Sequence, residues 1–316
     1  MLISLAPLQG LTEFPFRNAI HHLIGGIDNF YSPFLRLEND GSLKSKYVKD
    51  ILPENNSGTP IIPQILVNTT KDFLFLANII EDYGYREVNW NLGCPYPMVS
   101  KRKLGSGLIP YPEEIKEILE VVIPKTKLKI SIKIRAGLIE PTEIFSVLNA
   151  LESLPLTEII IHPRIAKQLY KGTADGEVFI QAQKQTAFKL AYNGDITSKA
   201  DFDELLLKLP DTNHFMIGRG LIANPFLGIE IKNGTDLPES EKRQLFFLFH
   251  QEILYHFEKK LSGDAHALNK MHGYWEYWSS LFSNSRKIYK LLKKVRCLND
   301  YNKLTSEFIK NEPLTN

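Results

Sequence analysis

Eight short β-rich runs alternate with helical segments over the first 230 or so residues, and this alternation restricts the fold more than any other feature. The runs lie at Ile3–Leu5, Phe30–Leu37, Ile61–Val67, Glu87–Asn91, Lys129–Ile134, Glu158–His162, Phe188–Tyr192 and His214–Ile217. Helical spacing follows most of them, at Glu13–Leu23, Lys71–Tyr83, Pro112–Ile123, Pro141–Leu154, Ser198–Leu209 and Pro225–Ile231. Eight such repeats predict an α/β fold, a (β/α)8 TIM barrel, with a doubly wound open sheet as the alternative.

The β-rich runs stop at residue 217, and the remainder of the chain has helical patterning. Lys232–Ser240 (KNGTDLPES) is polar and has the composition of a linker. Four helices are expected after it, at Glu239–Leu261, Asp264–Phe282, Asn284–Leu298 and Asp300–Lys310. We therefore expect a catalytic barrel domain at residues 1–235 and a C-terminal all-α helical bundle at residues 240–316.

The composition is that of an ordinary globular protein, with 43% hydrophobic and 23% charged residues. No apolar run approaches the roughly 18 residues that a membrane span requires, and the first residues lack the basic region of a signal peptide. The chain has only two cysteines, Cys94 and Cys297, so no disulfide framework is expected. These features favour a cytoplasmic protein that is not bound to a membrane.

Polar residues recur where the expected strands end, which is where (β/α)8 barrels carry their functional groups. Taken singly, each has an ordinary explanation, such as a buried histidine or a tight turn. Taken together, they predict a polar ring around one cleft. Its members, in chain order, are Pro7, Leu8, Gln9, Gln64, Asn91, Cys94, Lys133, Arg135, His162, Asn193, Gly194, Asp195, Gly218 and Arg219.

The chemistry of this ring suits a flavin. Barrels commonly bind phosphate at the loops after strands seven and eight, which here are Asn193–Asp195 and Gly218–Gly220. Gln64, Lys133 and His162 suit a ring rich in carbonyls and nitrogens, and Lys133 would stabilise negative charge on it. FMN meets both requirements. The sequence has no strand-GxGxxG-helix unit, no GxxxxGK[ST], no HExxH and no CxxC, so a dinucleotide fold, a P-loop and a metal site are not supported.

Seven stretches, in this order, resemble the tRNA-dihydrouridine synthases, FMN-dependent enzymes that reduce the C5=C6 bond of uridines in tRNA. They span nearly the whole expected barrel. The stretches are APLQGLTEFPFR (Ala6–Arg17), NLGCP (Asn91–Pro95), GSGLI (Gly105–Ile109), IKIRAG (Ile132–Gly137), HPR with a later Tyr170 (His162–Arg164), NGDI (Asn193–Ile196) and IGRGLIANP (Ile217–Pro225).

The resemblance implies a role for each matching residue. The first FMN-contacting turn would be Pro7, Leu8 and Gln9, the ring contacts Gln64, Lys133 and His162, and the later cofactor loops Asn193, Gly194, Asp195, Gly218 and Arg219. Cys94 would donate a proton, Asn91 and Arg135 would face the uracil, and NADPH would be the reductant.

The chain also departs from the family pattern at four positions. Gln9 replaces a small residue, Glu13 replaces Asp, Gly107 replaces Ala, and Pro163 replaces Gly or Ala. The last of these leaves the role of Arg164 open.

Reducing the uracil double bond requires a hydride at one carbon and a proton at the other. The resemblance implies that reduced FMN delivers the hydride to C6 and that Cys94 protonates C5. A free thiol has a pKa of about 8.5 and is mostly protonated at neutral pH, so it can act as the acid. Lys133 and Arg135 are two residues apart on one expected strand, so both point to the same face.

The positive charge lies in the C-terminal quarter, where Glu241–Asn316 holds 13 Lys and Arg against 8 Asp and Glu. The run Arg286–Arg296 has six basic residues and no acid. Its basic residues Arg286, Lys287, Lys290, Lys293 and Lys294 are expected on one helical stripe, opposite Ile288, Leu291, Leu292, Val295 and Leu298.

We interpret this stripe as a tRNA contact, with a solvated helix face as the alternative. Lys101 and Arg102, a few residues past Cys94, are candidates for phosphate contact or for a plain basic loop. The aromatic cluster Tyr274–Trp278 favours core packing over base stacking. Two other functions remain open, an FMN barrel acting on a small molecule and an inactive RNA-binding homologue.

Overall fold

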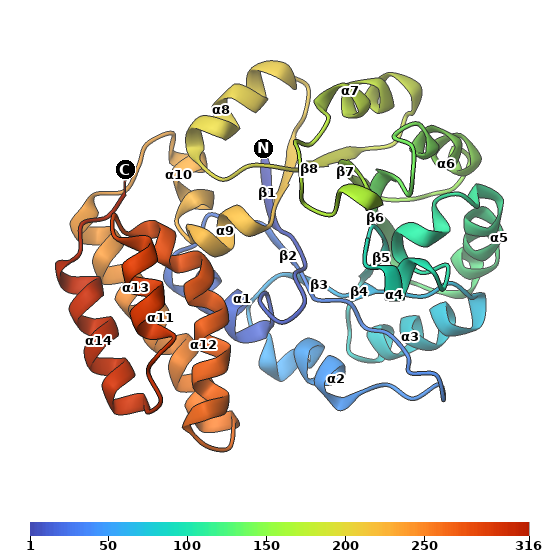
Figure 1. Cartoon of the computed structure of the whole chain (residues 1–316). Helices are drawn as coiled ribbons and strands as arrows, with labels where there is room; N and C mark the ends of the chain where they lie inside the picture. Colours follow the sequence, from blue (N-terminus) through green and yellow to red (C-terminus); the bar gives the residue numbers. More distant parts are fainter. Residues whose placement is uncertain (316) are drawn as a thin grey trace.

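The computed structural model, which describes residues 1–315, is a nearly closed parallel barrel with helices around it (Figure 1). Its strands are β1 (Leu2–Leu5), β2 (Asn29–Tyr31), β3 (Ile61–Ile62), β4 (Gln64–Ile65), β5 (Glu87–Leu92), β6 (Lys129–Gly137), β7 (Ile159–Ile165), β8 (Leu190–Asn193) and β9 (His214–Ile217). All their pairings are parallel, in the order β3-β2-β1-β9-β8-β7-β6-β5-β4.

The third barrel strand is interrupted at Pro63, which separates β3 from β4. Proline has no N–H for a strand hydrogen bond, so the strand is split at this position. The part before Pro63, β3, pairs with β2, and the part after it, β4, pairs with β5. The Pro63 carbonyl still accepts from the Asn89 N–H at 2.9 Å. Because β3 and β4 join the two ends of the sheet, the barrel prediction is confirmed and the open-sheet alternative is wrong.

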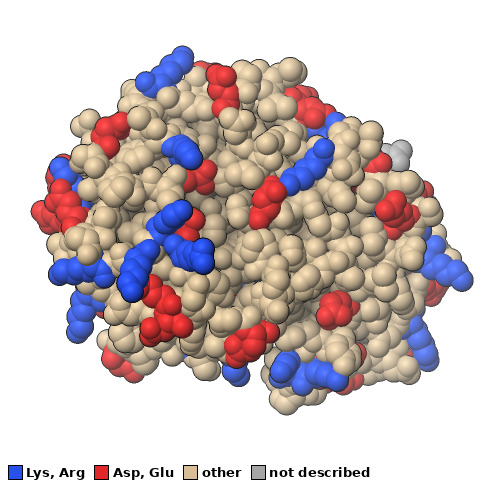
Figure 2. Space-filling model, turned by 180° about the vertical axis from the view of Figure 1, so that it is seen from behind, with Lys and Arg blue, Asp and Glu red and all other residues tan. Residues whose placement is uncertain are grey.

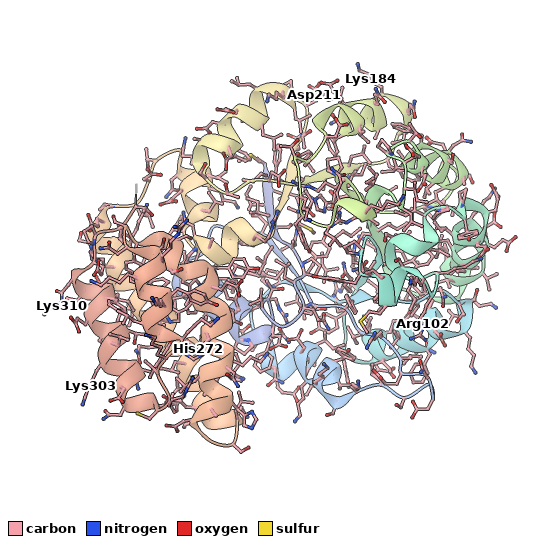
Figure 3. All side chains as sticks on the ribbon, in the orientation of Figure 1. Arg102, Lys184, Asp211, His272, Lys303 and Lys310 are labelled. Carbon is pink, nitrogen blue, oxygen red and sulfur yellow. The ribbon has the colours of Figure 1, made fainter. Side chains whose placement is uncertain are left out.

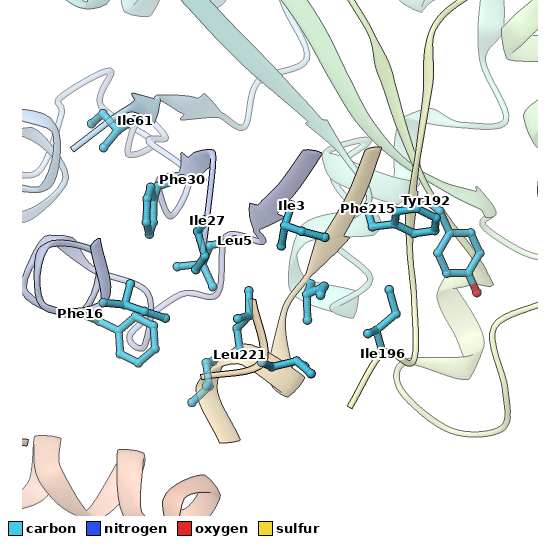
Figure 4. Close-up of a cluster of buried hydrophobic side chains, with 14 of the residues drawn as sticks. Ile3, Leu5, Phe16, Ile27, Phe30, Ile61, Tyr192, Ile196, Phe215 and Leu221 are labelled. Atoms are coloured by element: carbon cyan, nitrogen blue, oxygen red, sulfur yellow. The ribbon is translucent and has the colours of Figure 1, made fainter. Parts of the chain in front are cut away.

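Polar and apolar side chains form separate groups inside the barrel. Successive residues of a strand face opposite ways, and Asn89 faces inward, where it donates to the Ser131 hydroxyl at 3.0 Å. A small apolar cluster packs Ala6, Tyr31, Ile160, Ala191 and Met216 together. The larger core lies outside the strands, against the helices; Figure 4 shows part of it, with Ile3, Leu5, Phe30 and Phe215.

Six barrel helices form where the sequence predicts them. They are α1 (Phe14–Leu23), α3 (Thr70–Asp82), α5 (Pro112–Val122), α6 (Glu143–Leu151), α8 (Lys199–Lys208) and α10 (Leu227–Asn233). Four more were not predicted: α2 (Ser45–Ile51), α4 (Pro97–Ser100), α7 (Gly176–Gln185) and α9 (Arg219–Ala223). Three of these are short, and α7 buries only Val178, Phe179 and Ala182, so its apolar stripe is narrow.

Four helices lie beside the barrel at the C-terminal end of the chain (Figure 1, orange to red). They are α11 (Glu239–Lys260), α12 (Asp264–Trp278), α13 (Ser285–Leu292) and α14 (Leu298–Asn311). The Tyr274 hydroxyl donates to the Leu11 carbonyl at 2.6 Å, and Lys270 pairs with Glu13 at 2.7 Å. The Phe16 ring stacks on Tyr274, so both regions share one core, and the division at 235/240 stays a prediction.

The helix expected at Asn284–Leu298 is shorter than predicted, because α13 ends at Leu292. The N–H groups of Lys294 and Val295 donate to carbonyls three residues back, which tightens the final turn and stops the helix. Lys293 and Lys294 therefore lie in a turn and not on the α13 face. Leu291 is 37% exposed, so its placement on the apolar stripe is wrong.

The interior of the helical region is aromatic, as the sequence predicts. Tyr274, Trp275 and Trp278 are fully buried. The Tyr301 hydroxyl accepts from Trp275 Nε1 at 2.6 Å and bonds to His250 Nε2 at 2.8 Å. Core packing is thus confirmed for three of the four aromatic residues between 274 and 278.

Charges of both signs are interspersed on the face of the molecule seen from behind (Figure 2). In the part of the chain that the structure covers, none of the helices has the length and apolar character that crossing a membrane would demand.

Candidate active site

A cleft with a volume of about 630 Å³ opens at the carboxyl ends of the strands. A smaller pocket of about 80 Å³ adjoins it. The two share Pro7, Leu8, Lys133, His162, Tyr170 and Arg219. Cys94, Asn91, Gln9 and Arg135 line only the cleft, and Asn193, Gly194, Asp195 and Gly218 line only the pocket. The structure thus gathers most of the predicted ring around one continuous space.

The Cys94 loop is held from two sides. The Asn91 side-chain oxygen accepts from the N–H groups of Gly93 and Cys94 at 3.0 and 2.9 Å. On the other side, the N–H and hydroxyl of Ser106 donate to the Cys94 carbonyl at 3.1 and 2.9 Å. Gly105, at φ 56°, lies so close that a Cβ there would be 2.8 Å from Cys94 Cβ. The GSGLI motif therefore fixes the Cys94 loop through Gly105 and Ser106.

The Cys94 thiol is a protonated acid at neutral pH. Cys94 is only 8% exposed and packs with Leu66 and Val99. Burial raises the pKa of the Cys94 thiol, and the opposing effects of Arg135 and Arg36 are smaller. A raised pKa suits a proton donor and does not suit a nucleophile.

Asn91 and Gln64 belong to a row of buried amides inside the barrel. The Asn91 NH₂ donates to the Gln64 oxygen at 2.7 Å, and the Gln64 NH₂ donates to Asn89 at 2.7 Å. Gln64 is fully buried and lies outside the cleft lining. It therefore acts on the site through Asn91, and its contact with a cofactor stays a prediction.

Lys133 and Arg135 share one face of β6, as the spacing predicts, but they differ in their partners. No hydrogen bond or ion pair engages Lys133 within residues 1–315, and burial together with Arg135 lowers the pKa of Lys133 to about 7. Arg135 donates through Nε to the Gly93 carbonyl and through Nη1 to the Ile165 carbonyl, each at 3.1 Å. Burial lowers the pKa of Arg135 to about 10. Lys133 is thus available to a ligand, whereas Arg135 also supports the Cys94 loop.

Arg164, whose role the sequence left open, links His162 to Asp195. Its guanidinium donates to both Asp195 oxygens, at 2.7 and 2.6 Å, and to the Gly172 carbonyl at 2.5 Å. The same Nη1 lies 3.3 Å from His162 Nε2. Because a guanidinium only donates, His162 Nε2 accepts, and the ring proton is on Nδ1.

His162 is therefore a neutral hydrogen-bond donor in the cleft. Burial holds the pKa of His162 well below its usual value, and the cations Lys133, Arg135, Arg164 and Arg219 lower it further.

The pocket side of the site is formed by the loops after β8 and β9. The Asn193 NH₂ donates to the Met216 carbonyl at 2.7 Å and ties the two loops together. A Cβ on Gly218 would lie 3.3 Å from Leu8 Cδ1, within the pocket. Arg219 lies 4.5 Å from the Tyr170 ring and 3.6 Å from Asp195. The pocket thus has an exposed backbone at Gly218, where no side chain blocks a ligand, next to the guanidinium of Arg219.

The cations predicted to bind RNA lie outside the cleft lining. Arg102 donates to the Asn39 side chain at 3.0 Å and, with Lys101, follows α4 at the surface (Figure 3). Arg286, Lys287 and Lys290 are exposed on α13, and Lys293 and Lys294 are exposed after it. Their contact with RNA stays a prediction.

The cleft is also lined by residues to which the sequence gave no role in the site: Phe34, Arg36, Lys46, Tyr47, Tyr96, Met98 and Val99, together with Tyr277 from the aromatic cluster that was expected to pack in the core. Tyr96 and Met98 directly follow the cysteine motif, which was a usable signal. The helical spacing of Met271, Tyr274, Trp275 and Trp278 assigns those residues to the core, and Tyr277 falls outside that set.

Comparison with known proteins gives one family. The family model described as dihydrouridine synthase matches residues 4–311. A relative from Neisseria meningitidis serogroup B, tRNA-dihydrouridine(16) synthase, is 29% identical over 78% of this chain and 78% of its own. A relative from Helicobacter pylori, a probable tRNA-dihydrouridine synthase, is 27% identical over 93% of this chain and 89% of its own.

Solved structures with low identity share the barrel. 2-Naphthoyl-CoA reductase has a TM-score of 0.57 at 11% identity, covering 75% of this chain and 50% of that protein. Morphinone reductase has a TM-score of 0.51 at 13% identity, covering 76% of this chain and 90% of that protein. At this identity, the likeness concerns the fold alone.

Proposed function

The chain belongs to the dihydrouridine synthase family and is an oxidoreductase, and from this premise we propose that it reduces the C5=C6 bond of specific uridines in tRNA to 5,6-dihydrouridine. FMN is the proposed cofactor and NADPH the proposed reductant. The observation that carries the proposal is the Cys94 thiol, protonated and fixed in a cleft that also contains the Lys133 amine, which has no hydrogen-bond or ion-pair partner within residues 1–315.

The residues of the site fit FMN. Arg219 and the open floor at Gly218 suit a phosphate in the smaller pocket. Lys133 suits a ring that becomes more negative when it is reduced, and the Nδ1–H of His162 suits a ring carbonyl or nitrogen. When bound, reduced FMN supplies the hydride that adds to C6 of the uracil.

Cys94 completes the reduction by giving its proton to C5. Because its pKa is raised, the thiol holds the proton until the developing enolate draws it away. Asn91 keeps the loop in place through Gly93 and Cys94. Arg135 keeps the Nη2 group of its guanidinium for the uracil O4, where it would stabilise negative charge.

The proposed substrate is tRNA, with its target uridine flipped out of the RNA into the cleft. Exposed cations at Lys101, Arg102 and along α13 would hold the phosphates. The open cleft and the basic C-terminal region favour this substrate over a free small molecule. The intact acid at Cys94 argues against an inactive RNA-binding homologue.

The test compares the two cysteines of the chain. Wild type, Cys94→Ala and the matched control Cys297→Ala are assayed for FMN absorption and for dihydrouridine formed in unmodified tRNA. Cys94→Ala is expected to keep FMN and lose about 10²- to 10⁴-fold of the turnover, the usual contribution of a general acid. Cys297→Ala, at the start of α14, is expected to match wild type. Full activity in Cys94→Ala would remove Cys94 from this role.

A further inference from the structure

Three large apolar side chains stand at the mouth of the cleft. Met98 is 81% exposed and Tyr96 is 52% exposed, both just after Cys94, while Tyr277 is half-buried on α12. All three line the same cleft as Cys94. Exposed apolar groups next to a functional site usually mark a binding surface, because leaving them in water is otherwise unfavourable.

These residues come from two separate regions, with Tyr96 and Met98 on the barrel and Tyr277 on the helical region. Tyr96 and Tyr277 line the same cleft, and burial, followed by Glu276, raises the pKa of the Tyr277 phenol. No hydrogen bond engages the Tyr277 phenol within residues 1–315. Tyr277 packs against the core on one side and lines the cleft on the other, whereas its neighbours Tyr274 and Trp278 are fully buried.

Cations lie beside these aromatic groups. Arg36, Lys46 and Arg219 line the same cleft. Arg36 forms an ion pair with Glu38, in which 4.0 Å separates Arg36 Nε from the carboxylate. A groove that combines cations with aromatic rings is typical of proteins that bind single-stranded nucleic acid, since the rings stack on bases while the cations contact phosphates.

We propose that Tyr277, Tyr96 and Met98 form a stacking site for the unpaired base next to the target uridine, with Arg36 and Lys46 at the adjoining phosphates. The inference rests on the proposed function, since it requires an RNA substrate. It follows from the continuity of these residues with the Cys94 cleft: a uridine that reaches Cys94 carries its neighbour to the cleft mouth.

The test is a double-mutant cycle between the protein and the RNA. The position of dihydrouridine is first mapped with wild type. The dissociation constant is then measured for tRNA and for tRNA lacking the base on either side of that uridine. Loss of one base–aromatic stack weakens binding by roughly ten-fold or more, which is expected both for Tyr277→Ala with intact tRNA and for wild type with abasic tRNA.

Three further variants sharpen the cycle. Tyr277→Phe keeps the ring and is expected to bind within two-fold of wild type, whereas Tyr277→Leu keeps apolar volume without the ring and should be weak. Tyr255→Ala removes an exposed tyrosine of α11 outside the cleft and should have no effect. FMN absorption verifies the fold of each variant.

The decisive result is coupling: removing the neighbouring base should not weaken Tyr277→Ala, or Tyr277→Leu, any further. If wild type forms dihydrouridine and the two losses simply multiply, the stacking site is overturned while the proposed function stands. If wild type forms no dihydrouridine in any tRNA, the proposed function itself fails.

Discussion

At the amino-terminal ends of the barrel strands the buried polar side chains bond to one another, whereas at the carboxyl ends some of them point into the cleft without a partner. His214 bonds through Nε2 to the Ser4 hydroxyl at 2.6 Å and through Nδ1 to Glu158 at 2.7 Å. At the other end, Lys133 has no partner within residues 1–315. Polar side chains that hydrogen-bond to one another stabilise the fold, whereas a buried polar side chain without a partner, such as Lys133, can bind a ligand. Substitutions at the two ends should therefore have opposite effects.

Of the substitutions that compare the two ends of the strands, Lys133→Met is expected to have the largest effect. Lys133→Met removes the cation that faces the cofactor, and loss of one such preorganised group typically costs about 10²- to 10³-fold in turnover. Dihydrouridine formation at saturating FMN measures this loss. Unchanged turnover would mean that the Lys133 amine is not part of the site.

The same variant should not be less stable than wild type. In the cofactor-free protein the pKa of Lys133 is about 7, below its value of about 10.4 in an unfolded chain. The unfolded state therefore binds more protons between these values, and the stability of the wild type rises with pH across that window. Urea unfolding at pH 7 and pH 9.5 should show this rise in wild type and a smaller one in Lys133→Met.

The opposite pattern is expected at the amino-terminal end. His214→Ala leaves Ser4 and Glu158 without their partner and should lower the free energy of unfolding by about 2–3 kcal/mol. Turnover per folded molecule should remain that of wild type. A loss of turnover without a loss of stability would contradict the division between the two ends.

A smaller effect is expected from the basic residues along α13 and in the turn after it. Replacing Lys290, Lys293 and Lys294 by Gln should weaken tRNA binding by about ten-fold and lower the salt slope by about one for each phosphate that is no longer neutralised. Lys303 and Lys310 on the exposed side of α14 are matched controls (Figure 3). Equal effects in both sets would indicate general attraction without a defined binding surface.

The smallest effect concerns the protonation state of His162. Burial is the main cause of its low pKa, and Arg164→Gln removes one of the four cations that lower it further, so the pKa of His162 should rise in this variant. Arg164→Lys keeps the charge and should not show this change. The absorption spectrum of bound FMN, recorded from pH 8 to pH 5, distinguishes the two variants, with only a few-fold change in FMN affinity expected at neutral pH. If the FMN spectra of the two variants changed identically with pH, the charge of Arg164 would not control the protonation of His162.

The strands and most of the helices were predictable because their signals are local. The eight β-rich runs and the cap residues next to the helices, such as Ser198 before α8, lie within the segments that they define. The end of α13 was not predictable, because the apolar residues continue to Val295 and only the following turn to α14 stops the helix.

The sequence predicted most of the residues that line the site, but not the hydrogen bonds and ion pairs between them. The spacing of Lys133 and Arg135 gave their common face, but nothing in it distinguishes the unpaired lysine from the arginine that holds Gly93. The link from Asp195 through Arg164 to His162 joins residues 31 positions apart. Tyr277 reaches the cleft only because α12 docks on the loop after β1.

The interruption at Pro63 has a consequence for heat inactivation. β3 and β4 contribute two residues each to the barrel, so the ladder between β2 and β5 is short and interrupted, and its amide hydrogens should be among the first in the barrel to exchange. Gln64 lies in β4, within this part of the barrel, and its side-chain oxygen accepts a hydrogen bond from Asn91. When this part of the barrel opens, the Cys94 loop loses its support, and catalysis should therefore disappear on warming before the rest of the molecule melts.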